Sequence, residues 1–403
     1  MTNLDRRALL QSLAAIGAVT LAGRAWAAPQ TNAKLLVVFL RGAHDAANVI
    51  IPTGSEFYYS ARPSLAIARP GSRPDQKKLE ALALDADWSL HPAFRDSLLP
   101  LCQKREIAFI PFAGTDDLTR SHFETQDTIE LGQSIHSTRD YRSGFLARLA
   151  GTLTGTKPIA FTNQVPLIFQ GRGDPIPNIG LNVGGKPAID DHHIALITEM
   201  YQGDSLAAAV QEGFHVRDDV YRAISRESDV ANRGAVSPKG FELSGRRIAQ
   251  VMKGGYNLAF VDVGGWDTHV NQGGATGYLA DRLGELGRGL VALSDELGPQ
   301  DWHDTVVAVI SEFGRTFREN GDKGTDHGHG STYWVLGGSV NGGRFHGPQV
   351  KVEEASLFQN RDFQVLTDYR SLFGGLLGKM YGLNSSALNT IFPTAKPVDL
   401  ALV

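Results

Sequence analysis

The stretch that decides the fold reads L-L-V-V-F-L over residues 35–40 and continues as R-G-A-H-D over residues 41–45. A short, unbroken apolar run that contains β-branched residues indicates a strand buried on both faces of a sheet. Similar runs occur at residues 107–112, 258–263 and 305–310, and shorter candidates lie at 166–169 and 333–336. These runs predict a sheet that other elements cover on both sides.

Helical patterns separate these strands. Leucines at 279, 283, 286, 290 and 293 alternate steps of four and three and form one apolar stripe, and residues 365–381 form a second pattern that Gly382 can end. Strands that alternate with helices predict an α/β fold, with a doubly wound and mostly parallel sheet. Residues 174–240 carry helical patterns, Gly, Pro and a charged stretch, so we expect a mostly helical insertion there.

The first 27 residues have the pattern of a twin-arginine signal peptide. Arg6 and Arg7 precede an apolar run at 13–23, and A-W-A at 25–27 is a small-x-small cleavage site. The alternative interpretation, an uncleaved amphipathic helix, leaves the position of that cleavage site unexplained. We therefore expect one mature domain, residues 28–403, which the twin-arginine export machinery carries folded to the periplasm or further out. No later apolar run reaches the ~20 residues that a membrane span needs.

Composition narrows the class of protein. Cys102 is the single cysteine and lies in an apolar stretch, so we expect a buried thiol and no internal disulfide. Loss of the leader would leave 36 basic and 42 acidic residues, a formal charge of about −6. This mildly acidic balance gives no basic footprint for nucleic acid.

Carboxylates and imidazoles follow the predicted strands at the points where the strands end. In open parallel sheets, ligands bind outside the carboxyl ends of the strands, so we expect these side chains to gather at one edge. Mixed oxygen and nitrogen ligands suit zinc, manganese or magnesium. The candidate ligands are Asp45, Asp267, His269, Glu312, Asp326, His327 and His329.

Most of these residues also have a simpler interpretation. Asp45 could cap the next helix, and the Asp267–His269 pair, whose side chains point the same way in extended backbone, could be a loop hydrogen-bond pair. Residues 326–329 could form a surface turn. Glu312, directly after a buried strand, is hard to explain as solvated surface. The shared topological position of the set favours a metal site.

A candidate nucleophile lies in T-R-S-H-F-E, residues 119–124. Ser121 and the glutamate three residues later form an S-x-x-E capping box, and the N–H groups of a helix N-terminus stabilise an anion. Ser121 is therefore either a helix cap or a nucleophile whose pKa a bound metal lowers. Thr119 is the alternative hydroxyl. Arg120 and His122 are candidates to bind an anionic substrate or to transfer a proton.

Several segments resemble those of a large bacterial family. They read L-R-G-A-H-D-A-A-N, Y-Y-S-A-R-P-S-L-A-I, T-R-S-H-F-E-T-Q-D, G-G-W-D-T-H, S-E-F-G-R-T and G-T-D-H-G-H-G, and they occur in the same order over essentially the whole mature chain. The family consists of twin-arginine-exported proteins known as a domain of unknown function, grouped with the alkaline phosphatase and sulfatase superfamily. The resemblance implies an alkaline-phosphatase-like core and two metal sites bridged by a Ser, Thr or modified Cys nucleophile.

The resemblance also implies roles for individual residues. The superfamily's first aspartate matches Asp45, its nucleophile falls within residues 119–121, and its central Asp–His pair resembles Asp267 and His269. Its D-H-G motif matches residues 311–314 by strand position, where Phe313 replaces a ligand histidine.

By letters, the same D-H-G motif matches Asp326-His327-Gly328, and the final superfamily histidine would then be His327 or His329. The loop at 326–329 would have to supply the imidazole that Phe313 removes. The segment T-R-S-H-F lacks the sulfatase cysteine signature, which argues against a formylglycine sulfatase.

Together these observations predict an exported metal-dependent hydrolase of phosphate or sulfate esters. Its substrate would be an anionic small-molecule ester, and its cofactor one or two divalent ions, zinc or manganese. The alternative, favoured by Phe313, is a non-catalytic metal-binding or assembly protein of the cell envelope.

Overall fold

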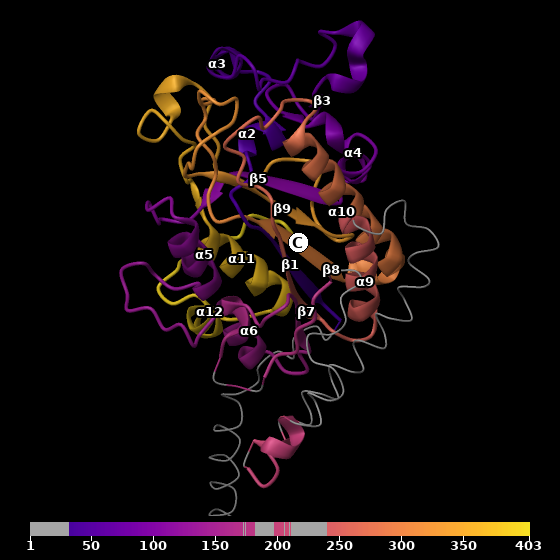
Figure 1. Ribbon diagram of the computed structural model, residues 1–403, viewed down its shortest axis with the longest axis vertical. Coiled ribbons are helices and arrows are strands. Elements are labelled where there is room, and N and C mark those ends of the chain that lie inside the picture. Colours follow the sequence, from indigo (N-terminus) through magenta and orange to yellow (C-terminus); the bar gives the residue numbers. More distant parts are fainter. Residues whose placement is uncertain are drawn as a thin grey trace, which may run out of the picture.

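The computed structural model describes residues 32–171, 173, 175–181, 197–204, 206–208, 210 and 240–403. The signal peptide expected at 1–27 lies outside these residues, and so does most of the helical insertion expected at 174–240. The described residues form an α/β structure around a central sheet with helices on both of its faces (Figure 1).

The central sheet is mostly parallel, as expected. Its strand order is β10-β5-β9-β8-β1-β7-β6. Strand β1 pairs in parallel with β7 and β8, β7 pairs in parallel with β6, and β10 with β5, whereas β9 is antiparallel to both β5 and β8. The strands are β1 (Lys34–Leu40), β5 (Ile107–Gly114), β6 (Pro158–Phe161), β7 (Leu258–Val263), β8 (Thr305–Ile310), β9 (Ser331–Leu336) and β10 (Thr367–Asp368).

Both faces of the sheet are buried, which explains the unbroken apolar run of β1. Leu36 and Val38 belong to one core with α4 (Leu98–Gln103), α9 (Phe241–Lys253) and α10 (Tyr278–His303). Leu35 and Val37 belong to a second core on the opposite face. The helices of that second core are α5 (His122–Leu131), α6 (Phe145–Thr152), α11 (Tyr369–Tyr381) and α12 (Ser385–Ile391).

Small elements cover the end of the molecule near α2 (Figure 1). They include α2 (Ala46–Val49), α3 (Glu56–Ala61) and a three-stranded antiparallel sheet of β2 (Ile50–Ile51), β4 (Ser89–Leu90) and β3 (Leu82–Ala83). Short 3₁₀ turns are η2 (Pro74–Leu79), η3 (Pro92–Phe94), η4 (Leu167–Phe169) and η5 (Glu354–Ser356).

The four long strand predictions and the prediction at 333–336 are confirmed, and Gly382 ends α11 in the left-handed conformation, with φ 62°. The strand predicted at 166–169 is wrong. Residues Leu167–Phe169 form η4, and the strand in this region is β6 at Pro158–Phe161. Short apolar runs do not distinguish a strand from a helical turn. Cys102 is a buried free thiol, as expected, and burial raises its pKa to about 12.

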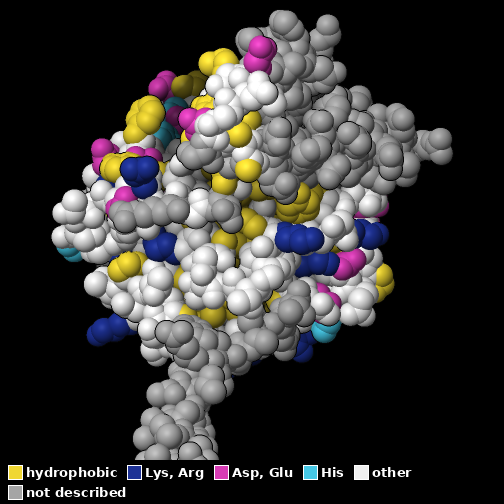
Figure 2. All heavy atoms as spheres, turned by 90° about the horizontal axis from the view of Figure 1, so that it is seen from below, with side chains coloured by type: hydrophobic (Ala, Val, Ile, Leu, Met, Phe, Trp, Pro, Cys, Tyr) yellow, Lys and Arg dark blue, Asp and Glu magenta, His cyan; other side chains and the backbone are white. Residues whose placement is uncertain are grey.

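The face seen from below Figure 1 carries basic side chains interspersed with acidic and polar ones (Figure 2). This mixture agrees with the small net charge of the sequence. None of the helices in the described ranges has both the length and the apolar character that a membrane crossing requires.

Candidate metal centre

The antiparallel direction of β9 decides where the polar loops meet. The loop over residues 311–330 leaves the carboxyl end of β8 and returns to the start of β9, so both of its ends lie at the same edge of the sheet. The loops after β1 and β7 begin at this edge because their strands are parallel to β8. Four chain segments thus bring side chains together here, the fourth being the start of α5.

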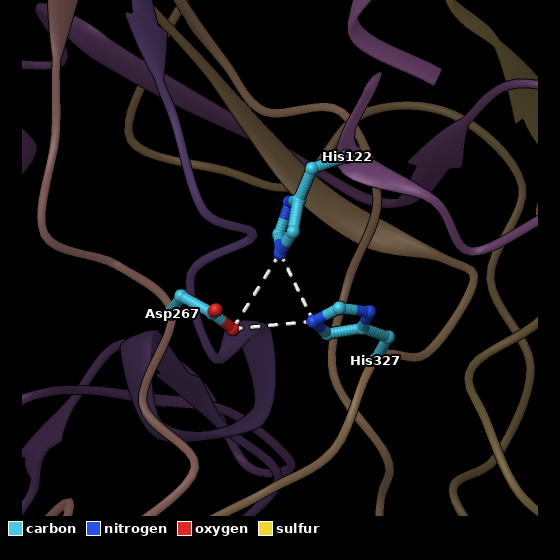
Figure 3. Close-up of side chains that lie close together, drawn as sticks. All are labelled: His122, Asp267 and His327. Atoms are coloured by element: carbon cyan, nitrogen blue, oxygen red, sulfur yellow. Dashed lines mark hydrogen bonds and ion pairs between the residues drawn. The ribbon is translucent and has the colours of Figure 1, made fainter. Parts of the chain in front are cut away.

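Four potential ligand atoms lie near one another at this edge. They are the Nε2 atoms of His122, His269 and His327 and the Oδ1 atom of Asp267. Nε2 of His327 lies 2.9 Å from Nε2 of His122, 3.0 Å from Nε2 of His269 and 3.2 Å from Asp267 Oδ1. Asp267 Oδ1 lies 2.9 Å from His269 Nε2 and 3.5 Å from His122 Nε2. Figure 3 shows His122, Asp267 and His327 pointing toward one another.

The hydrogen bond made by the other ring nitrogen, Nδ1, fixes the tautomer of each of these three histidines. Each Nδ1 faces an oxygen that only accepts hydrogen bonds, so Nδ1 carries the proton, and a neutral ring then has its lone pair on Nε2. The acceptors are the Glu312 carboxylate for His122 (2.7 Å), the Arg120 carbonyl for His327 (2.9 Å) and the Asp326 carboxylate for His269 (3.3 Å). Histidines that bind a metal commonly have such a partner on the outer nitrogen.

The Nε2 lone pairs of His122 and His327 therefore lie close to each other and to Asp267 Oδ1, and the Nε2 lone pair of His269 lies beside His327 and Asp267. Lone pairs at these separations repel each other unless a proton or a metal cation lies between them. Ligands around a tetrahedral zinc ion, with bonds near 2.0–2.1 Å, stand about 3.3 Å apart. The separations among His122, Asp267 and His327, which are 2.9–3.5 Å, bracket this value, so these three residues fit a divalent ion.

Glu312 is the buried anion behind His122. Its Oε1 accepts from His122 Nδ1, from the Gly42 N–H at 2.8 Å and from Gln126 Nε2 at 2.9 Å, and its side chain is fully buried. Burial raises the pKa of Glu312, but the hydrogen bonds from His122, Gln126 and Gly42 lower it more, so the net pKa lies below the ordinary value. The hydrogen bond to Glu312 raises the pKa of His122.

Arg315 lies on the other side of the cluster. Its fully buried guanidinium places NH1 2.6 Å from Asp267 Oδ1, and its Nε donates to the Thr325 hydroxyl at 3.2 Å. Burial raises the pKa of Asp267, but the pairing with Arg315 and the nearby imidazoles lower it below the ordinary value. Asp267 is therefore an anion in the neutral pH range.

Glycines let the 311–330 loop fold back against its neighbours. A Cβ on Gly324 would lie 2.1 Å from the His269 carbonyl oxygen, and one on Gly328 would lie 2.4 Å from the backbone of Arg315. The chain also forms an antiparallel bridge between Arg315 and His327. This close backbone packing holds His327 opposite His269.

The predicted nucleophile Ser121 is the N-cap of α5. Its hydroxyl accepts a hydrogen bond from the Glu124 N–H at 3.5 Å, which is a long bond, and the next residue, His122, belongs to the cluster. The Thr119 hydroxyl lies 3.4 Å from that of Thr125. The Ser121 hydroxyl thus caps α5, and the first residue of that helix belongs to the cluster.

Arg120 contacts the cluster through its backbone. Its guanidinium donates to Asp362 at 2.6 and 3.0 Å and to Gln359 at 2.8 Å, while its carbonyl accepts from His327. Its φ of 53° lies in the left-handed region, which is uncommon for a residue with a side chain. The side chain predicted to bind a substrate anion is therefore engaged in an ion pair.

Asp45 occupies the N-cap position of α2, yet its side chain does not cap that helix. Both of its oxygens accept from the Arg62 guanidinium, at 2.5 and 2.9 Å, and Oδ2 also accepts from Gln272 Nε2 at 2.6 Å. Arg62 further donates to the carbonyl of Phe317 at 2.6 Å. Asp45 thus belongs to a buried ion pair that ties α2 to the 311–330 loop.

His329 and Phe313 have separate surroundings. The ring of His329 packs against Phe358 at 5.0 Å, and burial lowers its pKa to about 4. Phe313 is buried, and its ring stacks on His122 at 5.0 Å and packs on His327 at 5.2 Å. Phe313 forms an apolar wall behind these two imidazoles.

Among the described residues, a single group of three or more His, Cys, Asp or Glu ligand atoms lies within 4.8 Å of one another, and it is His122, Asp267 and His327. His269 extends this group through its contacts with Asp267 and His327. The described part of the chain therefore gathers one candidate metal centre.

A cavity of about 290 Å³ lies next to the loop that carries Asp267. Gly264 and Trp266 of that loop line it, together with Asn163 and Arg282. It lies at the carboxyl ends of β6 and β7, the usual place for ligands in parallel sheets.

Sequence reasoning identified Asp267, His269 and His327 from their positions near strand ends. It assigned His122 to substrate binding or proton transfer, although the side chain lies in the cluster, and its helix-start motif was the available signal. It did not select Gln126 or Gln272, because a single glutamine in a loop or on a helix carries no pattern.

The fold and the site thus define an α/β protein with a histidine-rich candidate metal centre at the carboxyl edge of its sheet. The chain belongs to the family described as "Protein of unknown function (DUF1501)", whose sequence profile matches residues 32–392. No curated protein matches the chain in a sequence comparison.

Proposed function

We propose that this chain is a metal-dependent hydrolase of phosphate or sulfate esters, related to the alkaline phosphatase and sulfatase superfamily. One observation carries the proposal: His122 Nε2, His327 Nε2 and Asp267 Oδ1 lie 2.9–3.5 Å from one another. Nitrogen-rich donor sets with a carboxylate suit zinc, and manganese is the second candidate. A bound divalent ion polarises an ester oxygen and lowers the pKa of a nearby hydroxyl.

Ser121 is the proposed nucleophile. It precedes His122 at the N-terminus of α5, where backbone N–H groups favour an anion. The Arg120 and Arg315 guanidinium groups are the two cations proposed to bind an ester oxygen, and each would first have to leave its carboxylate partner, which is Asp362 for Arg120 and Asp267 for Arg315.

The proposed reaction has two displacements. The Ser121 hydroxyl loses its proton to water, its oxygen forms a bond to phosphorus or sulfur, and the bond to the alcohol oxygen breaks. The alcohol leaves with a proton taken from water. A water molecule then attacks the serine ester, which releases phosphate or sulfate and returns the proton to Ser121.

The alternative function, a non-catalytic metal-binding or assembly protein of the envelope, is favoured by the number of ligands. His269 lies beside Asp267 and His327 and would be the fourth donor if it joined His122 at the ion, and four protein ligands are typical of structural zinc sites. Catalytic zinc sites keep a position open for water or substrate. Without His269, the group of His122, Asp267 and His327 would leave such a position open.

The proposed location is the periplasm or another exported compartment. The supporting feature is the twin-arginine pattern at residues 1–27. A fusion of these residues to a reporter that folds in the cytoplasm tests export, and replacement of Arg6 and Arg7 by lysine should retain the reporter in the cytoplasm.

The test of the reaction is a panel of chromogenic phosphomonoesters, phosphodiesters and sulfates with added zinc or manganese. Ser121→Ala should lower the rate by about 10³-fold or more, and Thr119→Val should leave it nearly unchanged. The matched control is Asn384→Ala, which removes the N-cap of α12, where Asn384 accepts from the Ala387 N–H at 3.0 Å. Both cap variants should lose about 1 kcal/mol of stability.

Full activity in Ser121→Ala would remove this residue from the mechanism. Silence of the metal-loaded wild type across the whole panel would favour the non-catalytic alternative.

A further inference from the structure

Gln272 is a fully buried residue that joins three of the loops around the candidate metal centre. Its Nε2 donates to Asp45 Oδ2 at 2.6 Å. Its Oε1 accepts from the hydroxyls of Thr268 at 2.6 Å and Thr325 at 2.9 Å. The orientation of the amide follows from chemistry, because the Asp45 carboxylate only accepts and each hydroxyl can donate.

The partners of Gln272 lie next to the ligands in the chain. Thr268 stands between Asp267 and His269, and Thr325 is two residues before His327. A backbone hydrogen bond also joins these two loops, because the Thr325 N–H donates to the Thr268 carbonyl at 3.0 Å. Gln272 therefore spans the two loops that supply three of the four ligand atoms.

The far side of Gln272 is anchored. Asp45 is held by two hydrogen bonds from Arg62, which is fully buried and also donates to the Thr316 carbonyl at 3.0 Å. A glutamine bound to a fixed acceptor on one side and to both ligand loops on the other limits how far the loops can separate.

We propose that Gln272 is a positioning residue that sets the distance between the Asp267–His269 loop and the His327 loop, and thereby the affinity for the metal ion. The inference rests on the metal centre of the proposed function. Gln272 has no hydrogen bond to the side chains of His122, Asp267, His269 or His327, and it acts on them through Thr268 and Thr325. Loss of such outer partners commonly weakens metal binding 10–100-fold.

The test is cobalt(II) titration of the full mature chain, followed by its visible absorption spectrum, which reports the ligand geometry. Gln272→Leu should raise the dissociation constant for cobalt about 10–100-fold and change the spectrum. The double variant Thr268→Val, Thr325→Val keeps the bond between Gln272 and Asp45, and it should shift affinity in the same direction. If Gln272→Leu does not fold, this double valine variant provides the test.

The matched control is Thr305→Val. Thr305 is a fully buried threonine at the start of β8, and its hydroxyl donates to the Asp301 carbonyl at 2.6 Å. This variant should lose thermal stability and keep the wild-type affinity and spectrum. Stability of all variants is measured without metal.

Wild-type affinity and spectrum in Gln272→Leu, or in the double valine variant, would overturn the role of Gln272 alone. An equal loss of affinity in Thr305→Val would do the same, because it would show a general effect of destabilisation. Failure of the folded wild type to bind cobalt would instead contradict the proposed function.

Discussion

Oε1 of Glu312 lies 2.7 Å from Nδ1 of His122, and the carboxylate is fully buried. This contact turns Nε2 of His122 and its lone pair toward His327 and Asp267. A buried anion behind an imidazole also increases the basicity of the ring, which strengthens a bond to a metal ion. The pair therefore links the end of β8 to the start of α5.

Replacement of Glu312 by glutamine tests this role. Glu312→Gln keeps the size of the side chain but removes the negative charge behind His122, so metal affinity should fall about 10–100-fold. Isothermal titration with zinc measures the change. The control is Glu130→Gln, a buried carboxylate that accepts from Arg41 at 2.9 Å and should leave zinc affinity unchanged. Equal zinc affinity in Glu312→Gln and the wild type would contradict the assignment.

A second prediction concerns the close packing of the 311–330 loop. Gly324→Ala would place a Cβ 2.1 Å from the His269 carbonyl oxygen, so the backbone must move and the ligands on the two loops must separate. Zinc affinity should fall about tenfold or more, with a stability loss of about 1–3 kcal/mol. Gly321→Ala, in the same loop, meets no atom within 4 Å and should resemble the wild type. Similar behaviour of the two alanine variants would refute this explanation.

A third prediction concerns the contribution of the buried pair of Asp45 and Arg62 to the free energy of unfolding. Arg62→Met would leave the Asp45 carboxylate buried without its cation, which should cost about 3–5 kcal/mol of unfolding free energy. Adding Asp45→Asn removes the uncompensated charge, so the double variant should recover part of this loss. Urea denaturation of the wild type, Arg62→Met, Asp45→Asn and the double variant measures the coupling free energy between the two side chains. Additive losses in the double variant would show that the pair does not act as a unit.

A fourth prediction concerns His91 and the pH dependence of the free energy of unfolding. Burial lowers its pKa to about 4; its Nδ1 accepts from the Ala93 N–H, and its Nε2 faces the Gly274 carbonyl. The unfolded chain, with an ordinary histidine pKa near 6.5, therefore binds more protons between pH 6.5 and 4. This contribution to stability is complete above pH 6.5 and is lost as pH falls, by about 2 kcal/mol between pH 7 and 5.

His91→Asn keeps an acceptor for the Ala93 N–H and does not titrate. The metal-free wild type should therefore lose about 2 kcal/mol more unfolding free energy than this variant between pH 7 and 5. Urea denaturation at both pH values provides the comparison. Parallel losses in the two proteins would assign the acid sensitivity to other groups.

Local patterns predicted the centre of the fold better than its edges. The apolar runs of β1, β7 and β8 are buried on both faces, which leaves a clear pattern in the sequence. Edge strand β6 begins with Pro158 and has only four residues. Its sequence pattern was therefore no clearer than that of the nearby apolar run that forms η4. The direction of β9 could not be predicted, because strand direction depends on pairing with distant strands.

The same contrast applies to the site. Asp267, His269 and Glu312 could be selected because each lies within six residues of the end of a buried strand. The contacts of Arg62 and Gln272 could not, since both residues have distant partners that no local spacing reveals. Phe313 suggested a missing ligand, whereas in the structure it packs against His122 and His327.

The most direct test of the central claim is the metal content of the folded mature chain, purified without chelators and measured by plasma mass spectrometry. We expect about one equivalent of zinc or manganese per chain, retained on dialysis and lost in His327→Ala. His303→Ala, which removes an exposed histidine at the end of α10, should keep the metal. A folded wild-type chain that holds no stoichiometric metal, and takes up neither zinc nor manganese when they are added, would contradict the account.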